Sequence, residues 1–247
     1  MKHEEYERMY RFEDTYWWFV ARRHLIVSML DAHYPRGGGR RILDVGCGTG
    51  AMLDELAPFG DVTGADFAPE ALGFCRTRGS EYPLTRADIR RLPFASESFD
   101  IVTAMDIIEH IDDDKAAVVE IYRVLKPGGR LFVTVPAFPS LWSEHDEALY
   151  HHRRYTVPHM KDLLQRVGFA VPKISYTVTA LFPAIWLYRQ ISNLLPKRRA
   201  EGEKQANLVR VAGPVNAALL SLSEWETRLV HRLNLPFGVT VVCMAEK

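Results

Sequence analysis

The segment at residues 41–50, RILDVGCGTG, constrains the fold of this 247-residue chain more than any other. Five residues typical of a buried strand lead directly into three glycines at alternate positions, and a helical pattern follows from Ala51. Glycine lets the backbone take positive φ and lets a ligand approach the main chain closely. A tight turn without a ligand is the simpler interpretation, but alternate glycines with an acid, Asp44, at the strand end favour a binding loop.

Apolar segments of strand length alternate with helical patterns along the chain, which predicts βαβ units around a parallel sheet. We expect strands at about 41–45, 61–66, up to 88, 99–104, 130–135, 169–175 and 239–245. A helix is expected at 156–167, because Thr156 can cap it and Gly168 can end it. Residues 137–155 are polar and rich in histidine, and are expected to form a long loop. The predicted fold class is α/β, with a Rossmann-like, seven-stranded, mostly parallel sheet and helices on both faces.

The composition of the chain limits where in the cell we expect the protein and which partners we expect it to bind. The 31 lysines and arginines balance the 31 aspartates and glutamates, so nothing indicates the basic face that nucleic-acid binding needs. The three cysteines form no pair motif, which fits free thiols in a reducing cytoplasm. The charged N-terminus does not resemble a secretory signal, and the apolar run at 177–188 is shorter than the roughly 20 residues of a membrane span. We expect a cytoplasmic protein without nucleic-acid partners or a transmembrane segment.

Six short motifs follow one another between residues 41 and 135. They are 44–50 (DVGCGTG), 64–69 (GADFAP), 87–88 (AD), 92–94 (LPF), 98–100 (SFD) and 125–129 (LKPGG). In this order and spacing they resemble the successive motifs of class I S-adenosylmethionine-dependent methyltransferases. The small-molecule branch related to the ubiquinone and menaquinone methylases is the most similar. The resemblance implies a methyltransferase that uses S-adenosylmethionine as its cofactor.

The glycine loop also satisfies a second pattern. Gly46-x-Gly48-x-x-Ala51 matches the dinucleotide fingerprint GxGxxG/A, and an acid follows about 20 residues later. An NAD-dependent oxidoreductase is therefore the alternative enzyme class. A pyrophosphate prefers a helix N-terminus without a carboxylate nearby, whereas Asp44 lies just before the first glycine. S-adenosylmethionine has no phosphate, and its ammonium and sulfonium groups tolerate an acid, so the context favours the methyltransferase.

The resemblance also implies the roles of individual residues in binding the cofactor. The glycine loop would hold the methionine part, Asp66 would bind both ribose hydroxyls, and Asp88 would accept a hydrogen bond from the adenine amino group. The alternative is that both acids only cap strand ends. Their equal spacing after Asp44 places all three at the carboxyl ends of strands, where open α/β sheets bind ligands. The expected cofactor-binding residues are Asp44, Gly46, Cys47, Gly48, Gly50, Asp66, Phe67, Asp88, Ile89 and Met105.

Four adjacent aromatic residues, 16–19 (YWWF), precede Arg22 and Arg23 near the N-terminus. They cannot all face one side of a helix, so some must pack against another element. In the enzymes that this chain resembles, N-terminal helices form a lid over the active site, which implies such a lid here. Trp17, Trp18 and Arg22 are then candidates for substrate binding, with Arg22 or Arg23 meeting a carboxylate. The alternative is that the aromatic residues only attach an N-terminal helix to the core.

A histidine-rich stretch follows the fifth strand, at the edge of the sheet where this fold usually takes its substrate. A histidine with a pKa near 6.5 can act as a general base at neutral pH, and paired arginines suit a carboxylate or phosphate. The candidate bases are His145, His151, His152 and, after the fourth strand, His110. The candidate substrate-binding residues in this stretch are Arg153, Arg154 and Tyr155. The alternative is a solvated polar loop.

The same stretch also offers potential metal ligands. His145, Asp146 and either His151 or His152 could together hold an ion. No cysteine joins them and no metal motif matches their spacing. We therefore rank a metal below acid–base catalysis and anion binding, and expect none.

Residues 176–236 connect the sixth and seventh expected strands, which are joined by only a short segment in the smallest members of the family that this chain resembles. Two helical segments are separated there by a basic stretch, 197–204. In the second, apolar residues recur at steps of three and four, which indicates one apolar helical face. They are Val215, Leu219, Leu222, Trp225, Leu229 and Leu233. Packing on the domain, or on a second subunit in a homodimer, is the expected role. Contact with a lipid-like substrate or a membrane surface, beside residues 197–199, is the alternative.

These observations predict one methyltransferase domain spanning residues 1–247. Its parts are a helical lid at 1–36, a cofactor-binding core at 41–135, a substrate region at 136–175, a helical insertion at 176–236 between strands six and seven, and a last strand at 237–247. The predicted reaction is direct displacement, in which an oxygen, nitrogen or carbon nucleophile of a small, anionic or lipid-like acceptor attacks the sulfonium methyl. Besides the oxidoreductase, a non-catalytic cofactor-binding protein or partner subunit is an alternative.

Overall fold

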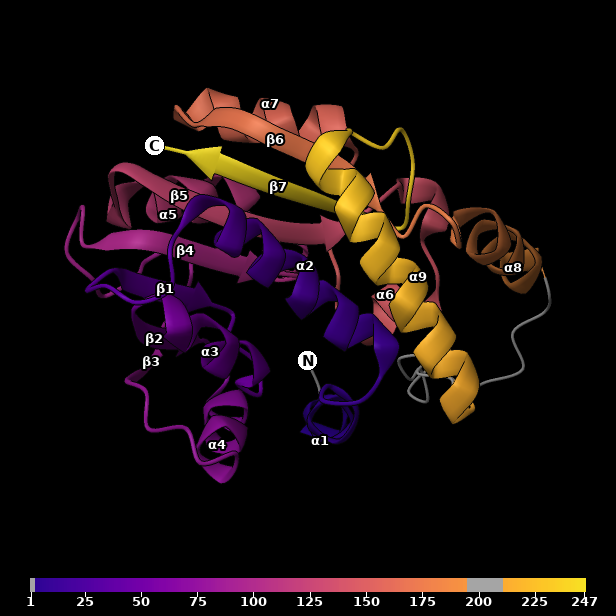
Figure 1. Cartoon of the computed structure of the whole chain (residues 1–247), viewed down its shortest axis with the longest axis horizontal. Helices are drawn as coiled ribbons and strands as arrows, with labels where there is room; N and C mark the ends of the chain where they lie inside the picture. The colour runs from indigo at the N-terminus through magenta and orange to yellow at the C-terminus, as the bar shows by residue number, and fades with distance from the viewer. Residues whose placement is uncertain (1–2, 195–210) are drawn as a thin grey trace.

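The structure is a computed structural model that describes residues 3–194 and 211–247. Its strands are β1 (Arg41–Val45), β2 (Asp61–Asp66), β3 (Leu84–Arg86), β4 (Phe99–Met105), β5 (Leu125–Pro136), β6 (Ala170–Thr177) and β7 (Thr240–Glu246). These seven form one sheet in the order β3-β2-β1-β4-β5-β7-β6, and every pairing is parallel except those of β7 (Figure 1). The predicted α/β class and the mostly parallel, seven-stranded sheet are confirmed.

Helices cover both faces of the sheet (Figure 1). They are α1 (His3–Phe12), α2 (Trp17–His33), α3 (Ala51–Leu56), α4 (Pro69–Thr77), α5 (Asp114–Val124), α6 (Glu144–Ala148), α7 (Val157–Val167), α8 (Phe182–Leu194) and α9 (Gly213–Arg232). Buried side chains of α2, α3, α4 and α9 share one core cluster with Ile42 of β1, whereas those of α5 and α7 share a second cluster with the next residue, Leu43. Both faces of β1 are therefore buried, which explains why its adjacent residues Ile42 and Leu43 are both apolar.

Two helix ends lie where the sequence predicts them. The hydroxyl of Thr156 accepts a hydrogen bond from the backbone N–H of His159 and caps α7, and Gly168 ends that helix at φ +118°. The segment 126–129 follows the end of α5 and lies inside β5, which begins earlier than the strand expected at 130–135. There the ammonium group of Lys126 is 2.8 Å from both carboxylate oxygens of Asp100 in the neighbouring strand.

The expectation of a long loop at 137–155 is wrong in part, because α6 lies within this segment. The N-terminus of α6 carries a capping box in which the side chains of Ser143 and Asp146 each accept from the other residue's backbone. This helix is only five residues long. Its sequence has no apolar periodicity, so only its caps could have indicated it.

The predicted apolar face of the insertion packs against the domain only in part. Val215, Trp225 and Leu233 of this face are about half exposed, while the buried positions of α9 are Glu226 and Val230. Packing on the domain therefore accounts for only part of this face, and packing on a second subunit stays a prediction for the rest. The side that α9 turns inward is fixed by its contact with α2, which lies beside it in Figure 1. The basic stretch 197–204 lies outside the described residues.

Glu226 explains why a charged residue is buried in α9. Its carboxylate accepts hydrogen bonds from the hydroxyl of Thr177 at 2.9 Å and from the backbone N–H groups of Val178, Thr179 and Ala180. These donors belong to the turn between β6 and α8. One buried carboxylate thus attaches α9 to the start of the insertion.

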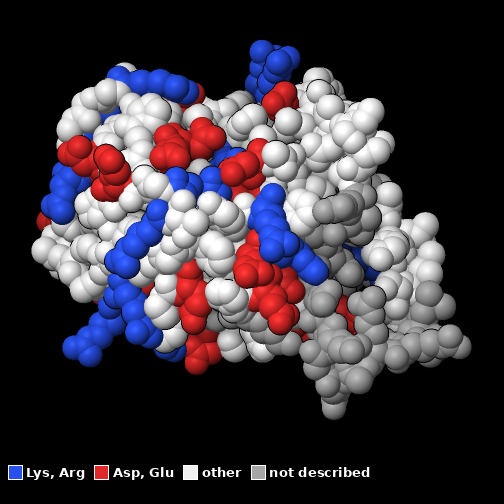
Figure 2. Space-filling model, turned by 90° about the horizontal axis from the view of Figure 1, so that it is seen from below, with Lys and Arg blue, Asp and Glu red and all other residues white. Residues whose placement is uncertain are grey.

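The described helices include none with the length and hydropathy needed to cross a lipid bilayer. On the face shown in Figure 2, lysine and arginine side chains lie among aspartate and glutamate side chains. This distribution agrees with the balanced charge of the sequence.

Candidate active site

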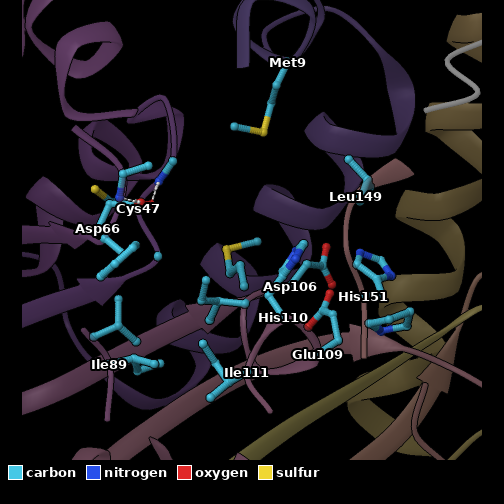
Figure 3. Close-up of a pocket in the computed structure, with 18 of the residues that line it drawn as sticks. Met9, Cys47, Asp66, Ile89, Asp106, Glu109, His110, Ile111, Leu149 and His151 are labelled. Carbon is cyan, nitrogen blue, oxygen red and sulfur yellow. Dashed lines mark hydrogen bonds between the residues drawn. The ribbon is translucent and has the colours of Figure 1, made fainter. Parts of the chain in front are cut away.

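A cavity of about 570 Å³ opens at the carboxyl ends of β1, β2, β4 and β5. One side is formed by the glycine loop after β1 and by the ends of β2 and β3, and the other by the segment after β4 and residues 145–154 (Figure 3). Helices α1 and α2 contribute further walls. Segments that are far apart in the sequence therefore meet in one cavity.

The glycine loop has a backbone that other residues rarely adopt. Gly46 has φ +71°, and a Cβ atom there would lie 2.5 Å from Cγ1 of Ile107. Gly48 has φ +55°, and its Cβ atom would lie 2.9 Å from Cε of Met9 in α1. The first contact involves a branched, packed side chain and the second the end of a flexible one. Both glycines are thus required by conformation, and Gly46 also by close packing.

Two of the three predicted acids are buried beside this loop. Asp44 accepts a hydrogen bond from the hydroxyl of Thr103 at 2.6 Å, and burial raises its pKa to about 7. Asp66 accepts from the backbone N–H groups of Gly48 at 3.0 Å and Ala68 at 2.9 Å, and burial raises its pKa as well. A pyrophosphate at this loop would therefore lie next to two carboxylates.

The third acid, Asp88, is less buried and already has a partner. Its carboxylate accepts hydrogen bonds from the backbone N–H of Arg90 at 2.9 Å and from the guanidinium of the same residue at 2.8 Å. These hydrogen bonds lower the pKa of Asp88. The side chain lines the cavity together with Ile89, Phe67 and Met105, as expected for a site that holds an adenosine.

The N-terminal helix α1 lines the cavity. The sequence predicted a lid in this region but did not indicate which residues of α1 take part. Glu5, Tyr6, Met9 and Glu13 all contribute to its wall, and Figure 3 shows Met9 above the glycine loop. Glu13 is fixed there by the hydroxyl of Thr49 and by the guanidinium of Arg78, whose Nη2 lies 2.5 Å away. The charged pattern of α1 gives no sign of this role, because these contacts join residues that are distant in the sequence.

Helix α2 directs Arg22 into the cavity. Its guanidinium forms an ion pair with Asp106, a residue with φ +48° directly after β4, and burial lowers the pKa of Arg22 to about 10. Trp18 and Phe19 line the cavity beside it. Trp17 does not: it is buried, and its backbone N–H donates to Asn216 of α9. The alternative role of attaching α2 to the core therefore applies to Trp17.

Glu109 is a fully buried carboxylate at the floor of the cavity. Neither of its oxygens has a hydrogen-bond partner. Burial raises its pKa to about 8. Glu109 is not among the predicted site residues, because nothing in the sequence distinguishes it from a solvated acid beside His110.

All four candidate histidine bases line the cavity. Burial lowers the pKa of both His110 and His145 to about 3, so both are neutral at physiological pH. Nδ1 of His151 lies 2.9 Å from Oδ1 of Asp146, and the ring of His151 packs edge-to-face against that of His110 at 4.6 Å between centroids. His152 lines the same wall, and its backbone N–H donates to the carbonyl of Glu109.

The predicted arginine pair does not offer two free guanidinium groups. Arg154 lines the cavity but binds both carboxylate oxygens of Asp146, at 2.8 and 3.1 Å. Arg153 faces Asp114, which also accepts a hydrogen bond from the hydroxyl of the buried Tyr155. The structure thus leaves Arg153 and Tyr155 outside the cavity wall. Gly50 also lies outside it, at the N-terminus of α3.

Comparison with known proteins gives the family of this fold and site. Residues 43–133 match the model of the methyltransferase domain family. A protein of Mycolicibacterium smegmatis, named a probable S-adenosylmethionine-dependent methyltransferase, is 32% identical over 162 residues, which are 64% of this chain and 61% of that protein. A demethylmenaquinone methyltransferase of Thermus thermophilus is 46% identical over 101 residues, which are 38% of this chain and 46% of that enzyme. The chain thus spans less than two thirds of the length of these relatives.

A solved structure has the same fold. The S-adenosylmethionine-dependent methyltransferase of Archaeoglobus fulgidus superposes with a TM-score of 0.55 at 20% identity, over 91% of this chain and 94% of that one. The matched residues 43–133 contain the glycine loop and the three strand-end acids, so the part of the chain that carries the predicted cofactor motifs is similar to S-adenosylmethionine-dependent methyltransferases. The similarity to a demethylmenaquinone methyltransferase agrees with the resemblance found in the sequence.

Proposed function

We propose that this protein transfers a methyl group from S-adenosylmethionine to a small-molecule acceptor by direct displacement. The observation that carries the proposal is one continuous cavity, which joins the glycine loop and strand-end acids to the cluster of histidines. An acceptor nucleophile held in this cavity can face the sulfonium methyl of the cofactor. Holding two reactants in line removes much of the entropic barrier of a bimolecular reaction.

In this proposal the cofactor would lie along the side of the cavity formed by β1, β2 and β3. Its ribose hydroxyls would bind Asp66, whose carboxylate is held in place by two backbone N–H groups. Its ammonium group would lie near Asp44, and its adenine between Phe67, Asp88 and Ile89. Two carboxylates beside the loop oppose a pyrophosphate, which argues against the NAD-dependent alternative.

The acceptor is placed on the opposite side, against Glu109, His110 and His151. The arginines there are engaged with acids, whereas Glu109, whose two carboxylate oxygens have no hydrogen-bond partner, lines the cavity. This arrangement favours an acceptor whose nucleophile carries a donor hydrogen over one bound through a carboxylate or phosphate. The anionic acceptor inferred from the arginines is accordingly the weaker proposal, and a histidine base stays a prediction.

Calorimetric titration with S-adenosylhomocysteine and with NADH tests the cofactor. We expect saturable binding of S-adenosylhomocysteine, and binding of NADH alone would refute the proposal. A methyl-release assay over a panel of small hydroxyl and amine compounds then tests turnover. Binding of the cofactor without turnover of any compound would favour the non-catalytic alternative.

Several structural expectations concern larger parts of the protein. The division of the chain into one domain with a lid at 1–36 agrees with α1 and α2 lining the cavity. The homodimer through 176–236 stays a prediction, and the exposed apolar residues of α9 are the surface on which it would be sought. Sedimentation at micromolar concentration would measure the oligomeric state directly.

A further inference from the structure

Three potential metal ligands meet in the wall of the cavity. Glu109 and His110 follow β4, and His151 follows α6; one ligand atom from each lies within 4.8 Å of the other two. Figure 3 shows the three side chains next to one another, across the cavity from Cys47 and Asp66. A carboxylate with two imidazoles is a ligand set that divalent transition metals bind.

The carboxylate of Glu109 lacks a partner that its burial requires. Buried polar groups in folded proteins are almost always hydrogen-bonded, and a buried charge is costly unless it is paired. Neither oxygen of Glu109 has a hydrogen-bond partner. The two cations whose charges act on it, Arg22 and Arg154, make their ion pairs with Asp106 and Asp146. A metal ion at this place would supply the missing partner.

His151 is held as metal-binding histidines usually are. Nδ1 of His151 is bound to the carboxylate of Asp146, which is itself fixed by Arg154, so Nε2 of His151 is left for a ligand. The ring of His110 packs edge-to-face against that of His151, with 4.6 Å between the ring centroids. In metal sites, the second ring nitrogen of a ligating histidine typically donates to a carboxylate or a backbone carbonyl, which fixes the ring and its tautomer.

We propose that Glu109, His110 and His151 bind a divalent metal ion, of which zinc best suits the ligand set. Asp146, a ligand in the sequence-based alternative, instead orients His151. Three protein ligands leave an open position toward the cavity, as in catalytic zinc sites. This inference rests on the proposed function, and it deepens that function by naming the acceptor group as a hydroxyl that completes the coordination of the ion.

The ion would activate the acceptor without a histidine base. A hydroxyl bound to a divalent ion has a lowered pKa and releases its proton to solvent water. The oxygen then forms a bond to the methyl carbon while the carbon–sulfur bond breaks, and the electron pair of that bond moves to sulfur. The products are a methyl ether and S-adenosylhomocysteine, so the charge of the sulfonium is neutralised by the oxygen anion.

The test is titration of the chelator-treated full chain with Co²⁺, followed by its visible absorption, and with Zn²⁺, followed by calorimetry. We expect one ion per chain, and at least a 100-fold loss of affinity in Glu109→Gln and His151→Ala. His24→Ala is the matched control, because His24 lies at the surface and contacts Glu224 of α9. Its affinity for the metal should equal that of the wild type.

Thermal melting of each metal-free variant shows whether it is folded. Glu109→Gln has nearly the same shape as the wild type and introduces no charge, so it is expected to fold. Failure to bind one ion, or equal binding by the wild type and Glu109→Gln, would overturn the metal site. S-adenosylhomocysteine is titrated into the same metal-free samples. If it binds there while the metal does not, only the metal inference fails. If the metal binds and S-adenosylhomocysteine does not, the proposed function and the assignment of a hydroxyl acceptor fail, while the metal site itself stands.

Discussion

Replacing Gly46 by alanine tests whether the glycine loop is built for close approach. Gly46 lies between the end of β1 and Ile107, and its backbone N–H donates to the carbonyl of Ala65 at 2.7 Å. The new Cβ atom would lie 2.5 Å from Cγ1 and 2.7 Å from Cβ of Ile107. Both atoms lie near the backbone of Ile107, so a change of rotamer cannot move them far enough.

The cost of Gly46→Ala has two parts. A non-glycine residue in the left-handed region costs about 1–3 kcal/mol, and an overpacked contact in a dense core costs about 1–3 kcal/mol more. We therefore expect the free energy of unfolding to fall by about 2–6 kcal/mol. For a protein of this size the midpoint of thermal unfolding should fall by about 5–15 °C. Affinity for S-adenosylhomocysteine should fall as well, because relief of the clash displaces the loop.

Gly73→Ala is the matched control. Gly73 is exposed in α4, and a Cβ atom there would have no heavy atom within 4 Å. Alanine in a helix is more favourable than glycine by about 0.5–1 kcal/mol, so this variant should melt slightly higher than the wild type and bind S-adenosylhomocysteine equally well. Differential scanning calorimetry and ligand titration measure both quantities. If Gly46→Ala behaved like Gly73→Ala, the structural argument for the glycine loop would be wrong.

Three further predictions follow from buried carboxylates. Burial raises the pKa of Asp44 from 3.8 to about 7, so the contribution of Asp44 to stability is largest at low pH and is lost as the pH rises from about 4 to 7. The ammonium group of S-adenosylhomocysteine needs the ionised form of Asp44, so the affinity measured by calorimetric titration should fall up to about tenfold per pH unit below 7. Asp44→Asn should abolish this pH dependence. Asp66→Asn should weaken the affinity for S-adenosylhomocysteine by about 2 kcal/mol, or roughly 30-fold, because an amide cannot accept from two ribose hydroxyls and two backbone N–H groups. Unchanged binding would refute the role assigned to Asp66. Glu226→Ala should lower the free energy of unfolding, measured in urea, by about 3 kcal/mol or more, because it leaves the backbone N–H groups of residues 178–180 without acceptors. A loss under about 0.5 kcal/mol would contradict the structural role of Glu226.

Local patterns in the sequence were sufficient for the core of the fold. The bounds of β1 and β2, and the ends of α7 at Thr156 and Gly168, lie where apolar periodicity and capping residues predict them. The cavity lies at the carboxyl ends of the strands, because parallel strands with crossover helices bring those ends to one edge. These features depend on residues that are close together in the chain, so they can be predicted from the sequence alone.

The partners of charged side chains were decided by tertiary structure. The sequence shows Arg154 beside Arg153, but only the fold brings Asp146 against Arg154 and leaves Glu109 without a partner. It likewise turns Met9 of α1 toward the glycine loop. The physical reason is that the free energy of a buried charge depends on what surrounds it, and those surroundings come from segments that are distant in sequence. The sequence alone therefore determined the fold and the residues at the carboxyl ends of the strands, and the tertiary structure decided which charged groups of the cavity are engaged with one another.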